Sequence, residues 1–260
     1  MNQPIFLSTP INTMETYYKE LRNLLRIKKI NDCDFIRMGN TNDGGYIMLD
    51  WIYKNGIAYS FGINDDVSWD LSMATCDYDV FMYDHTIPAL PQENIHFHFF
   101  REGIAGKTSQ PTNMPMDTLE NFIIRNQHMT NRNMILKMDV EGAEWDVLDS
   151  VSTNIMEQFD QVIIELHKLC TSVSWDDMAQ IIRGLENINK THTLVHLHGN
   201  NTGIAVKTDV GYFPDTMEAT YARTSSHDFS EDDDILLPIS LDAPNSSGHA
   251  EIPLGYWNRR

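Results

Sequence analysis

Short apolar runs of strand length alternate with helical segments along most of the chain. The apolar runs cover residues 57–61, 80–83, 95–100, 134–138, 161–164, 193–198 and 217–222. Segments with helical spacing of apolar residues separate several of them, for example residues 67–75 and 143–151. Short buried strands that alternate with helices form a mostly parallel sheet. The pattern therefore predicts an α/β fold with helices on both faces of the sheet.

The segment that precedes this alternation is different. Residues 11–29 place Met14, Tyr18, Leu21 and Leu25 on one stripe, which predicts an N-terminal helix. A turn with two glycines then leads into a short apolar run, and we expect a hairpin region there.

Residues 224–234 (TSSHDFSEDDD) are polar and acidic, which predicts an exposed loop. Three prolines in the segment that follows favour a wrapped tail over a second domain. We therefore expect one domain over residues 1–260. It would comprise an N-terminal helix and lead-in hairpin region over 1–50, a Rossmann-like core over 51–223, and an acidic loop and tail over 224–260.

Two helix starts carry capping signals. Asp117 with Glu120, and Ser174 with Asp177, have the spacing of a capping box. An apolar helical stripe follows each pair, so Asp117 and Ser174 are predicted to cap these helices.

The charge balance limits the partners of this chain. Lys and Arg number 19 against 37 Asp and Glu, which gives a formal net charge of −18. Such a surface repels phosphate backbones and anionic lipid, which argues against nucleic acid and membrane surfaces as partners. No apolar run approaches the ~20 residues of a membrane span, and the N-terminus lacks a secretory pattern. Three scattered cysteines without metal-ligand spacing suit a reducing compartment, so we expect a cytoplasmic protein.

Polar side chains follow nearly every predicted strand. In an open parallel sheet, ligands bind in the crevice beyond the carboxyl ends of the strands. Carboxylates and histidines gathered at that edge exceed what packing requires, so we take the edge as the candidate site. Its members include Gly62, Asn64, Asp65, Asp66, Asp84, His85, Gly103, Ile104, Asp139, Glu165, His167 and His198.

The turn after the first strand of the alternation indicates the cofactor. It holds one glycine, Gly62, and two aspartates, and it is not the GxGxxG that a dinucleotide pyrophosphate requires. Carboxylates suit a ligand with sulfonium and ammonium charges instead. Asp84 ends the next strand about 20 residues later, where an acid accepts hydrogen bonds from ribose hydroxyls. These features predict S-adenosylmethionine as the cofactor, and not NAD.

Residues 135–148 (ILKMDVEGAEWDVL) resemble the fourth-strand signature of FkbM-type methyltransferases, a group of class I S-adenosylmethionine-dependent O-methyltransferases. The resemblance covers roughly residues 35–223. It extends to residues 43–46, 59–66, 83–85, 159–167 and 196–201. The chain is similar to bacterial members encoded with capsule biosynthesis, which methylate hydroxyls of sugars such as nucleotide-linked heptoses.

The resemblance implies a class I methyltransferase fold, with a Rossmann-like, seven-stranded, mostly parallel sheet and a reversed last hairpin. It also implies a nucleotide-sugar or glycan as the substrate. It places Gly62, Asp84 and the Gly103–Ile104 region in the cofactor pocket. We expect their neighbours Ile63, Asn64, Asp66 and His85 to line the same pocket.

Methyl transfer from a sulfonium requires alignment of the acceptor oxygen and removal of its proton. Asp139 ends the central strand and is our first candidate for the general base. His167 and His198 are the alternatives, and Glu165 could orient either histidine. A second reading remains open, in which Asp139, Glu165 and a histidine hold Mg or Mn, which binds the sugar hydroxyls and lowers their pKa. His196 alternates with His198, so we expect it to face the other side of the sheet as a buried histidine.

Two other functions compete with methyl transfer. An NAD-dependent nucleotide-sugar dehydrogenase or epimerase is disfavoured because the chain lacks GxGxxG and a Tyr-x-x-x-Lys pair. A non-catalytic member of the fold is disfavoured because a retired site would have no reason to keep unpaired charges in a cleft. The oligomeric state and the identity of the sugar stay open.

Overall fold

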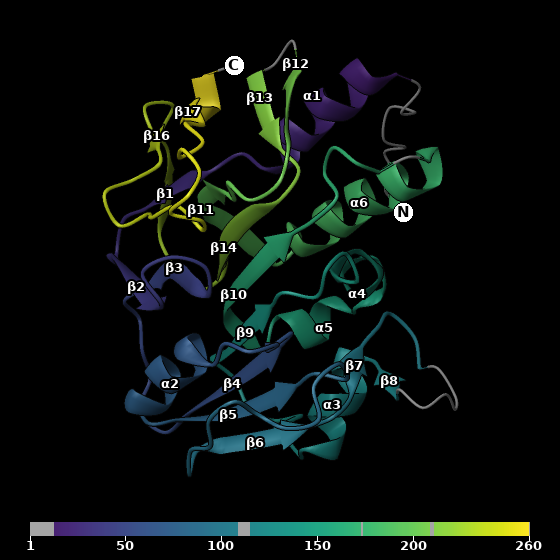
Figure 1. Ribbon diagram of the computed structural model, residues 1–260, viewed down its shortest axis with the longest axis vertical. Helices are drawn as coiled ribbons and strands as arrows, with labels where there is room; N and C mark the ends of the chain where they lie inside the picture. The colour runs from purple at the N-terminus through teal and green to yellow at the C-terminus, as the bar shows by residue number, and fades with distance from the viewer. Residues whose placement is uncertain (1–12, 109–114, 173, 209–210, 260) are drawn as a thin grey trace, which may run out of the picture.

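A seven-stranded sheet forms the centre of the computed structural model, which describes residues 13–108, 115–172, 174–208 and 211–259 (Figure 1). From one edge to the other the strands are β11 (His192–Gly199), β14 (Met217–Arg223), β10 (Phe159–Leu166), β9 (Met134–Met138), β4 (Gly56–Phe61), β5 (Tyr78–Tyr83) and β6 (Phe97–Phe100). β14 is antiparallel to both of its neighbours, and the other pairs are parallel. The predicted fold class, a mostly parallel sheet of seven strands with a reversed last hairpin, is confirmed.

The path of the chain through the sheet determines where a ligand can bind. The chain runs outward from β4 to β5 and β6, and it then returns to place β9 on the other side of β4. The strand order therefore changes direction between β4 and β9. In open α/β sheets a crevice forms at such a point, beyond the carboxyl ends of the strands.

The two larger apolar cores lie on opposite faces of this sheet, because side chains alternate along each strand. In β9, Leu136 and Met138 belong to one core and Ile135 to the other. The first core also receives residues from α1 (Met14–Leu24), α3 (Leu119–Arg125), α4 (Glu144–Ser150), α5 (Thr153–Met156) and α6 (Trp175–Ile188). The second is covered by α2 (Ser68–Thr75) and the hairpin of β2 (Phe35–Gly39) and β3 (Gly45–Leu49). Helices cover both faces as predicted, although one helix and a hairpin suffice for the second face.

The two predicted helix caps have different outcomes. Ser174 caps α6 as predicted, since its hydroxyl accepts the N–H of Asp177 at 3.1 Å. The cap of α3 is Thr118 and not Asp117, because the Thr118 hydroxyl accepts the N–H of Asn121 at 3.2 Å. The Asp117 carboxylate instead accepts the N–H of Thr118 at 2.9 Å and the side-chain amide of Asn121 at 2.6 Å. The predicted cap of α3 was one residue too early, because aspartate and threonine can both cap a helix and Asp117 directly precedes Thr118.

Besides the central sheet, the six helices and the β2–β3 hairpin, the described residues form four two-stranded sheets and one short helix. They are β1 (Lys28–Ile30) with β15 (Phe229–Glu231), β7 (Gly103–Ile104) with β8 (Met116–Asp117), β12 (Ala205–Thr208) with β13 (Gly211–Pro214), β16 (Leu236–Leu237) with β17 (Gly255–Tyr256), and the 3-10 helix η1 (Trp257–Arg259). The prediction of a loop over residues 224–234 was therefore wrong in part. The strand inside it pairs with a segment about two hundred residues earlier, and local sequence does not reveal such a partner.

The C-terminal segment packs back onto earlier parts of the chain (Figure 1). Trp257 is buried and donates its indole N–H to the carbonyl of Leu25 at 2.8 Å. The carbonyl of Pro244 accepts the side-chain amide of Asn42 at 2.7 Å. Among the described residues, no helix is both long enough and apolar enough to cross a membrane.

Candidate active site

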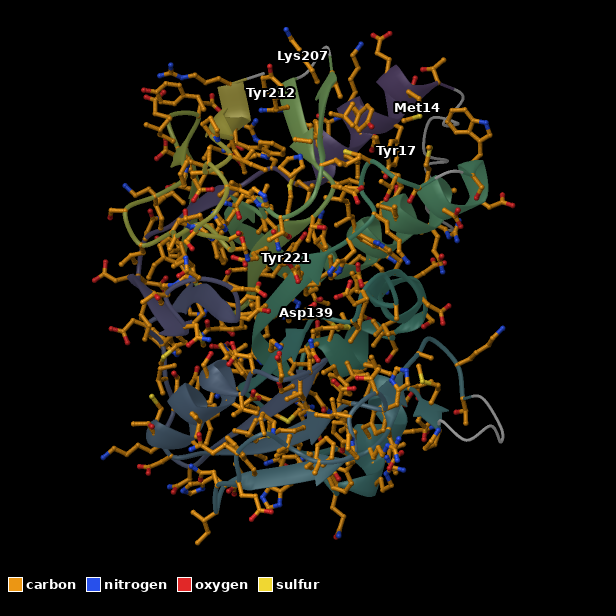
Figure 2. All side chains as sticks on the ribbon, in the orientation of Figure 1. Met14, Tyr17, Asp139, Lys207, Tyr212 and Tyr221 are labelled. Atoms are coloured by element: carbon orange, nitrogen blue, oxygen red, sulfur yellow. The ribbon has the colours of Figure 1, made fainter. Side chains whose placement is uncertain are left out.

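A cleft of about 650 Å³ opens where β4, β5, β9 and β10 end. Asp139, directly after β9, lies near the middle of the molecule (Figure 2). The cleft brings together every predicted site residue except His198. Those that line it are Gly62, Ile63, Asn64, Asp65, Asp66, Asp84, His85, Gly103, Ile104, Asp139, Glu165 and His167. The edge of the sheet chosen from the sequence is therefore the edge at which the cleft opens.

Gly62 allows the turn after β4 to approach the turn after β9. Its φ is +76°, and a Cβ atom at this position would lie 1.6 Å from the carbonyl oxygen of Asp139. Its N–H donates to the carbonyl of Tyr83 at 3.1 Å. A residue with a side chain would clash with the Asp139 backbone. Only glycine therefore allows the ends of β4, β5 and β9 to approach one another this closely.

Asp84 organises the same turn. One carboxylate oxygen accepts the N–H groups of Ile63 and Asn64 at 2.8 and 2.9 Å. The other accepts the N–H and the hydroxyl of Thr86 at 2.7 and 2.6 Å. Burial opposes ionisation, but the donors from Asn64, Thr86 and Ile63 outweigh it and lower the pKa of Asp84. Since these four bonds fill the acceptor positions of the carboxylate, ribose hydroxyls would compete with Thr86 for it.

Glu144 fixes the end of β10 to the start of α4. Its side chain is fully buried. One oxygen accepts the backbone N–H of His167 at 2.7 Å and lies 3.3 Å from Nδ1 of the same residue, while the other accepts the N–H of Gly142 at 2.8 Å. The Trp145 indole donates to the carbonyl of His167 at 2.8 Å. These contacts turn Nδ1 of His167 toward Glu144 and leave Nε2 toward the cleft.

Nε2 of His167 lies among three carboxylates. It is 3.4 Å from Glu165 Oε2, 3.6 Å from Glu141 Oε2 and 3.7 Å from Asp139 Oδ1. Burial lowers the pKa of His167, but its contacts with Glu144 and Glu165 outweigh this and raise the pKa to about 11. Burial raises the pKa of Glu165 to about 8, and the charge of Asp139 adds to this effect against the opposing effect of His167. The site therefore concentrates negative charge around one imidazole.

Two neutral side chains orient these carboxylates. The Tyr46 hydroxyl donates to Asp139 Oδ2 at 2.9 Å, and the Asn200 side-chain amide donates to Glu165 Oε1 at 2.6 Å. Burial and the Asp139 carboxylate raise the pKa of Tyr46 well above its usual value, so its hydroxyl remains a donor. The remaining oxygens, Asp139 Oδ1 and Glu165 Oε2, are the ones nearest His167.

Sequence reasoning missed the roles of Glu144, Tyr46 and Asn200. Acidic residues recur after the predicted strand, at Asp139, Glu141 and Glu144. This recurrence was the available signal for Glu144. Asn200 follows a predicted strand, and Tyr46 lies in a segment that the family resemblance covers, so the sequence indicated where both residues lie. It did not indicate their partners, which are 93 and 35 residues away in the chain.

His198 does not belong to the cleft. Its side chain is 1% exposed, and its two ring nitrogens each lie 3.1 Å from a carboxylate oxygen, of Glu218 and Glu251. Burial lowers its pKa, but the hydrogen bond with Glu218 and the surrounding acids raise it to about 9. A histidine whose ring nitrogens are both engaged cannot accept a substrate proton, so its selection as an alternative base is corrected. His196 is buried beside Asp242, as expected. The expectation that it faces the other side of the sheet from His198 was wrong, because residues two apart on a strand point to the same face and Asp242 lies near both histidines.

The charge of the cleft is strongly unbalanced. Seven carboxylates line it: Asp43, Asp65, Asp66, Asp84, Asp139, Glu141 and Glu165. Among the described lining residues there is one lysine, Lys137, and no arginine. The Lys137 ammonium donates to the carbonyl of Gly62 at 2.8 Å. Asp139, Glu141 and His167 also offer donor atoms that all lie within 4.8 Å of one another, which is a spacing that suits a metal ion.

The strand order, and the position of the cleft at the switch point, are those of a Rossmann-like methyltransferase. Residues 45–190 match the family described as "Methyltransferase FkbM domain". This match covers more than half of the chain, and the chain belongs to this family. Membership favours methyl transfer from S-adenosylmethionine over the NAD-dependent alternative.

A human relative, described as "Probable methyltransferase-like protein 24", is 28% identical over 116 residues. That stretch is 42% of this chain and 32% of the human protein, so the chain matches about a third of its relative.

Two solved structures are also similar. A putative rRNA-methylase from Clostridium thermocellum has a TM-score of 0.39 and 6% identity, over 66% of this chain and 90% of that one. A putative hemolysin from Streptococcus thermophilus has a TM-score of 0.39 and 10% identity, over 68% and 62%.

Proposed function

We propose that this protein transfers the methyl group of S-adenosylmethionine to a hydroxyl of a sugar. The sugar would be nucleotide-activated or part of a capsular or surface polysaccharide, such as a heptose. The observation that carries the proposal is the arrangement of Asp139, Glu165 and His167 around one point of the cleft that also contains the expected cofactor turn. Groups that take up protons and groups that suit a sulfonium ligand therefore line one cavity.

The cofactor half of the cleft consists of the turn from Gly62 to Asn64, with Asp84, His85 and the Gly103–Ile104 strand beside it. Backbone N–H groups and carboxylates there suit the amino acid, sulfonium and ribose parts of S-adenosylmethionine. The cavity volume lies within the roughly 300–1,000 Å³ that is typical of small-molecule sites.

The acceptor half is polar and rich in groups that bind hydroxyls. It includes Asp43, Tyr46, Asn200, Thr202 and Thr216. These side chains provide both hydrogen-bond donors and acceptors, and a sugar hydroxyl needs both. An acceptor group that carries a negative charge would meet the carboxylates of the cleft, so a neutral hydroxyl is the acceptor that fits.

In the reaction, the acceptor oxygen, the methyl carbon and the sulfur must lie in line. The hydroxyl proton must leave as the new bond forms. Asp139 is our first candidate for the proton acceptor because its Oδ2 is held by Tyr46 and its Oδ1 remains on the side of His167. Glu165, whose pKa is raised to about 8, is the main alternative. His167, whose pKa is raised to about 11, is an alternative only once it has lost the proton it holds. His198 is not proposed, because both of its ring nitrogens are engaged outside the cleft.

The experiment that tests this function is transfer of a labelled methyl group from S-adenosylmethionine to a panel of nucleotide-linked sugars. We expect label on a sugar oxygen for at least one nucleotide-linked heptose or related sugar. Position-specific deoxy sugars then identify the hydroxyl. Label that appears only on a nitrogen or a carboxylate, with no sugar in the panel methylated, would contradict the proposal.

A further inference from the structure

We infer that the cleft holds a divalent cation of the Mn²⁺ type between Asp139, Glu141 and His167, and that this cation binds two neighbouring hydroxyls of the acceptor. The role of the cation rests on the proposed function, whereas its binding does not. It follows from the donor atoms, their support and the charge of the cleft.

The donor set is the first argument. Two carboxylates and one imidazole nitrogen lie within 4.8 Å of one another, so one ion can contact all three. Nε2 of His167 is 3.6 Å from Glu141 and 3.7 Å from Asp139, and these separations leave room for an ion between them. The Glu141 side chain is 88% exposed, so it is free to move inward onto an ion.

The orientation of His167 is the second argument. Metal-binding histidines almost always direct their other ring nitrogen to a carboxylate or carbonyl, which fixes the tautomer and the ring. Nδ1 of His167 lies 3.3 Å from the fully buried Glu144, which also accepts the backbone N–H of His167. Glu144 thus holds the ring with Nε2 directed into the cleft.

Two polar atoms at the wall of the cleft are the third argument. The side chains of His167 and Glu165 are 10% and 7% exposed, and both line the cleft. His167 Nε2 and Glu165 Oε2 lie 3.4 Å apart. Because Glu144 and Asn200 engage the other polar atom of each side chain, Nε2 and Oε2 are the atoms that a ligand in the cleft can contact.

The charge of the cleft is the fourth argument. Seven carboxylates line it, and the Lys137 ammonium already donates to the carbonyl of Gly62. A sugar offers no positive charge to such a surface. A divalent cation would offset the carboxylates and offer coordination positions to sugar oxygens. Mn²⁺ suits the site because carboxylates favour Mg²⁺ and Mn²⁺, and an imidazole ligand favours transition metals.

The cation would act by lowering the pKa of a bound hydroxyl. With Asp139 holding the ion, the proton acceptor would be Glu165, the alternative to Asp139 named above, because it is the adjacent carboxylate outside the ligand set. The O–H bond breaks and its proton moves to Glu165, the oxygen–methyl bond forms, and the carbon–sulfur bond breaks. The electron pair of that bond remains on sulfur as S-adenosylhomocysteine.

The test measures binding of Mn²⁺ itself to the full chain after chelator treatment, by electron paramagnetic resonance or calorimetry. We expect one Mn²⁺ per chain. Glu141→Gln should weaken Mn²⁺ binding at least tenfold. Because the Glu141 side chain is exposed, this substitution should not impair folding. Glu144→Gln, which removes the carboxylate behind His167, should weaken it roughly 10- to 100-fold. Glu120→Gln, an exposed acid on α3, is the matched control and should leave binding unchanged.

Absence of Mn²⁺ binding at millimolar concentration, or equal binding by wild type and Glu141→Gln, would overturn the inference. Methyl transfer to a sugar that persists in excess EDTA would overturn the role of the cation while leaving the proposed function intact. Conversely, Mn²⁺ binding without transfer to any sugar would contradict the proposed function and not the site. A sugar that lacks the hydroxyl next to the methylated one should react at least tenfold more slowly.

Discussion

The Glu144 carboxylate accepts the backbone N–H of His167 at 2.7 Å, although 23 residues separate the two along the chain. Because Glu144 also accepts the N–H of Gly142, it joins the turn after β9, the first turn of α4 and the end of β10. The position of the His167 ring relative to Asp139 therefore depends on a side chain that does not line the cleft.

Replacement of Glu144 by alanine should destabilise the protein. It would leave the buried N–H groups of His167 and Gly142 without their acceptor, at about 1–3 kcal/mol for each. We expect the free energy of unfolding to fall by roughly 2–5 kcal/mol in urea denaturation. Glu120→Ala, at an exposed position of α3, should change it by less than about 1 kcal/mol. Equal stability of the two variants would show that the Glu144 contacts contribute little.

Replacement of Asp84 by alanine should weaken binding of S-adenosylhomocysteine. The variant loses an acceptor for ribose and also releases the N–H groups of Ile63 and Asn64. Calorimetry should show a loss of about 1.5–3 kcal/mol, or roughly tenfold to 150-fold in Kd. Thr86→Ala separates the two effects, because it removes one of the two hydrogen bonds to Asp84 Oδ1 and leaves the turn contacts to Oδ2 in place. If ribose uses Oδ1, Thr86→Ala should bind as well as wild type or better, whereas weaker binding would argue against a ribose contact.

Replacement of Asp139 by asparagine should lower turnover by about 100- to 10,000-fold, the usual contribution of a general base, if Asp139 takes the proton, and it should also lower turnover if Asp139 holds the cation and Glu165 takes the proton. The affinity for S-adenosylhomocysteine should change little, because the amide keeps a similar shape. His198→Gln is the comparison, and it should retain turnover within a few-fold once folded protein is isolated, since His198 lies outside the cleft. A large loss of turnover in His198→Gln with wild-type stability would return His198 to the candidate site.

The stability of the protein should depend on pH through His198. Its pKa of about 9 in the folded protein lies above the ~6.5 of an unfolded chain, because Glu218, Asp242 and Glu251 surround it. The stabilisation is fully present below about pH 6.5 and is lost as pH rises through 9. Urea denaturation of wild type and His198→Gln should therefore show a difference in unfolding free energy that shrinks by about 3 kcal/mol over this range. His249→Gln, an exposed histidine, should show no such trend, and a constant difference for His198→Gln would refute the assignment.

Replacement of Gly62 by alanine should be severely destabilising. The new Cβ would lie 1.6 Å from the Asp139 carbonyl oxygen, and the φ of +76° disfavours any side chain. We expect a loss of about 3 kcal/mol or more in unfolding free energy, together with weaker cofactor binding. Gly248→Ala is the control, because its nearest neighbour to a new Cβ is 3.6 Å away. A Gly62→Ala protein with normal stability would mean that the two turns separate easily.

Local pattern was sufficient for the elements of the core. The seven predicted strands coincide with the seven strands of the sheet, and the helices at residues 67–75 and 143–151 with α2 and α4. Such elements are detectable because burial of one face imposes a spacing of two or about 3.6 residues on the chain itself. The edge of the cleft was also predictable, since parallel strands must end at the same side of the sheet.

What the sequence determined by itself is thus the class of fold, the edge at which ligands bind and most residues along that edge. Only the tertiary structure decided which of those residues meet. It turned His198 toward Glu218 and Glu251 and away from the cleft, and it brought Glu144, Tyr46 and Asn200 to the carboxylates and imidazole of the site. The physical reason is that hydrogen bonds between distant segments depend on the packing of whole elements, and that packing leaves no periodic trace in the residues near each partner.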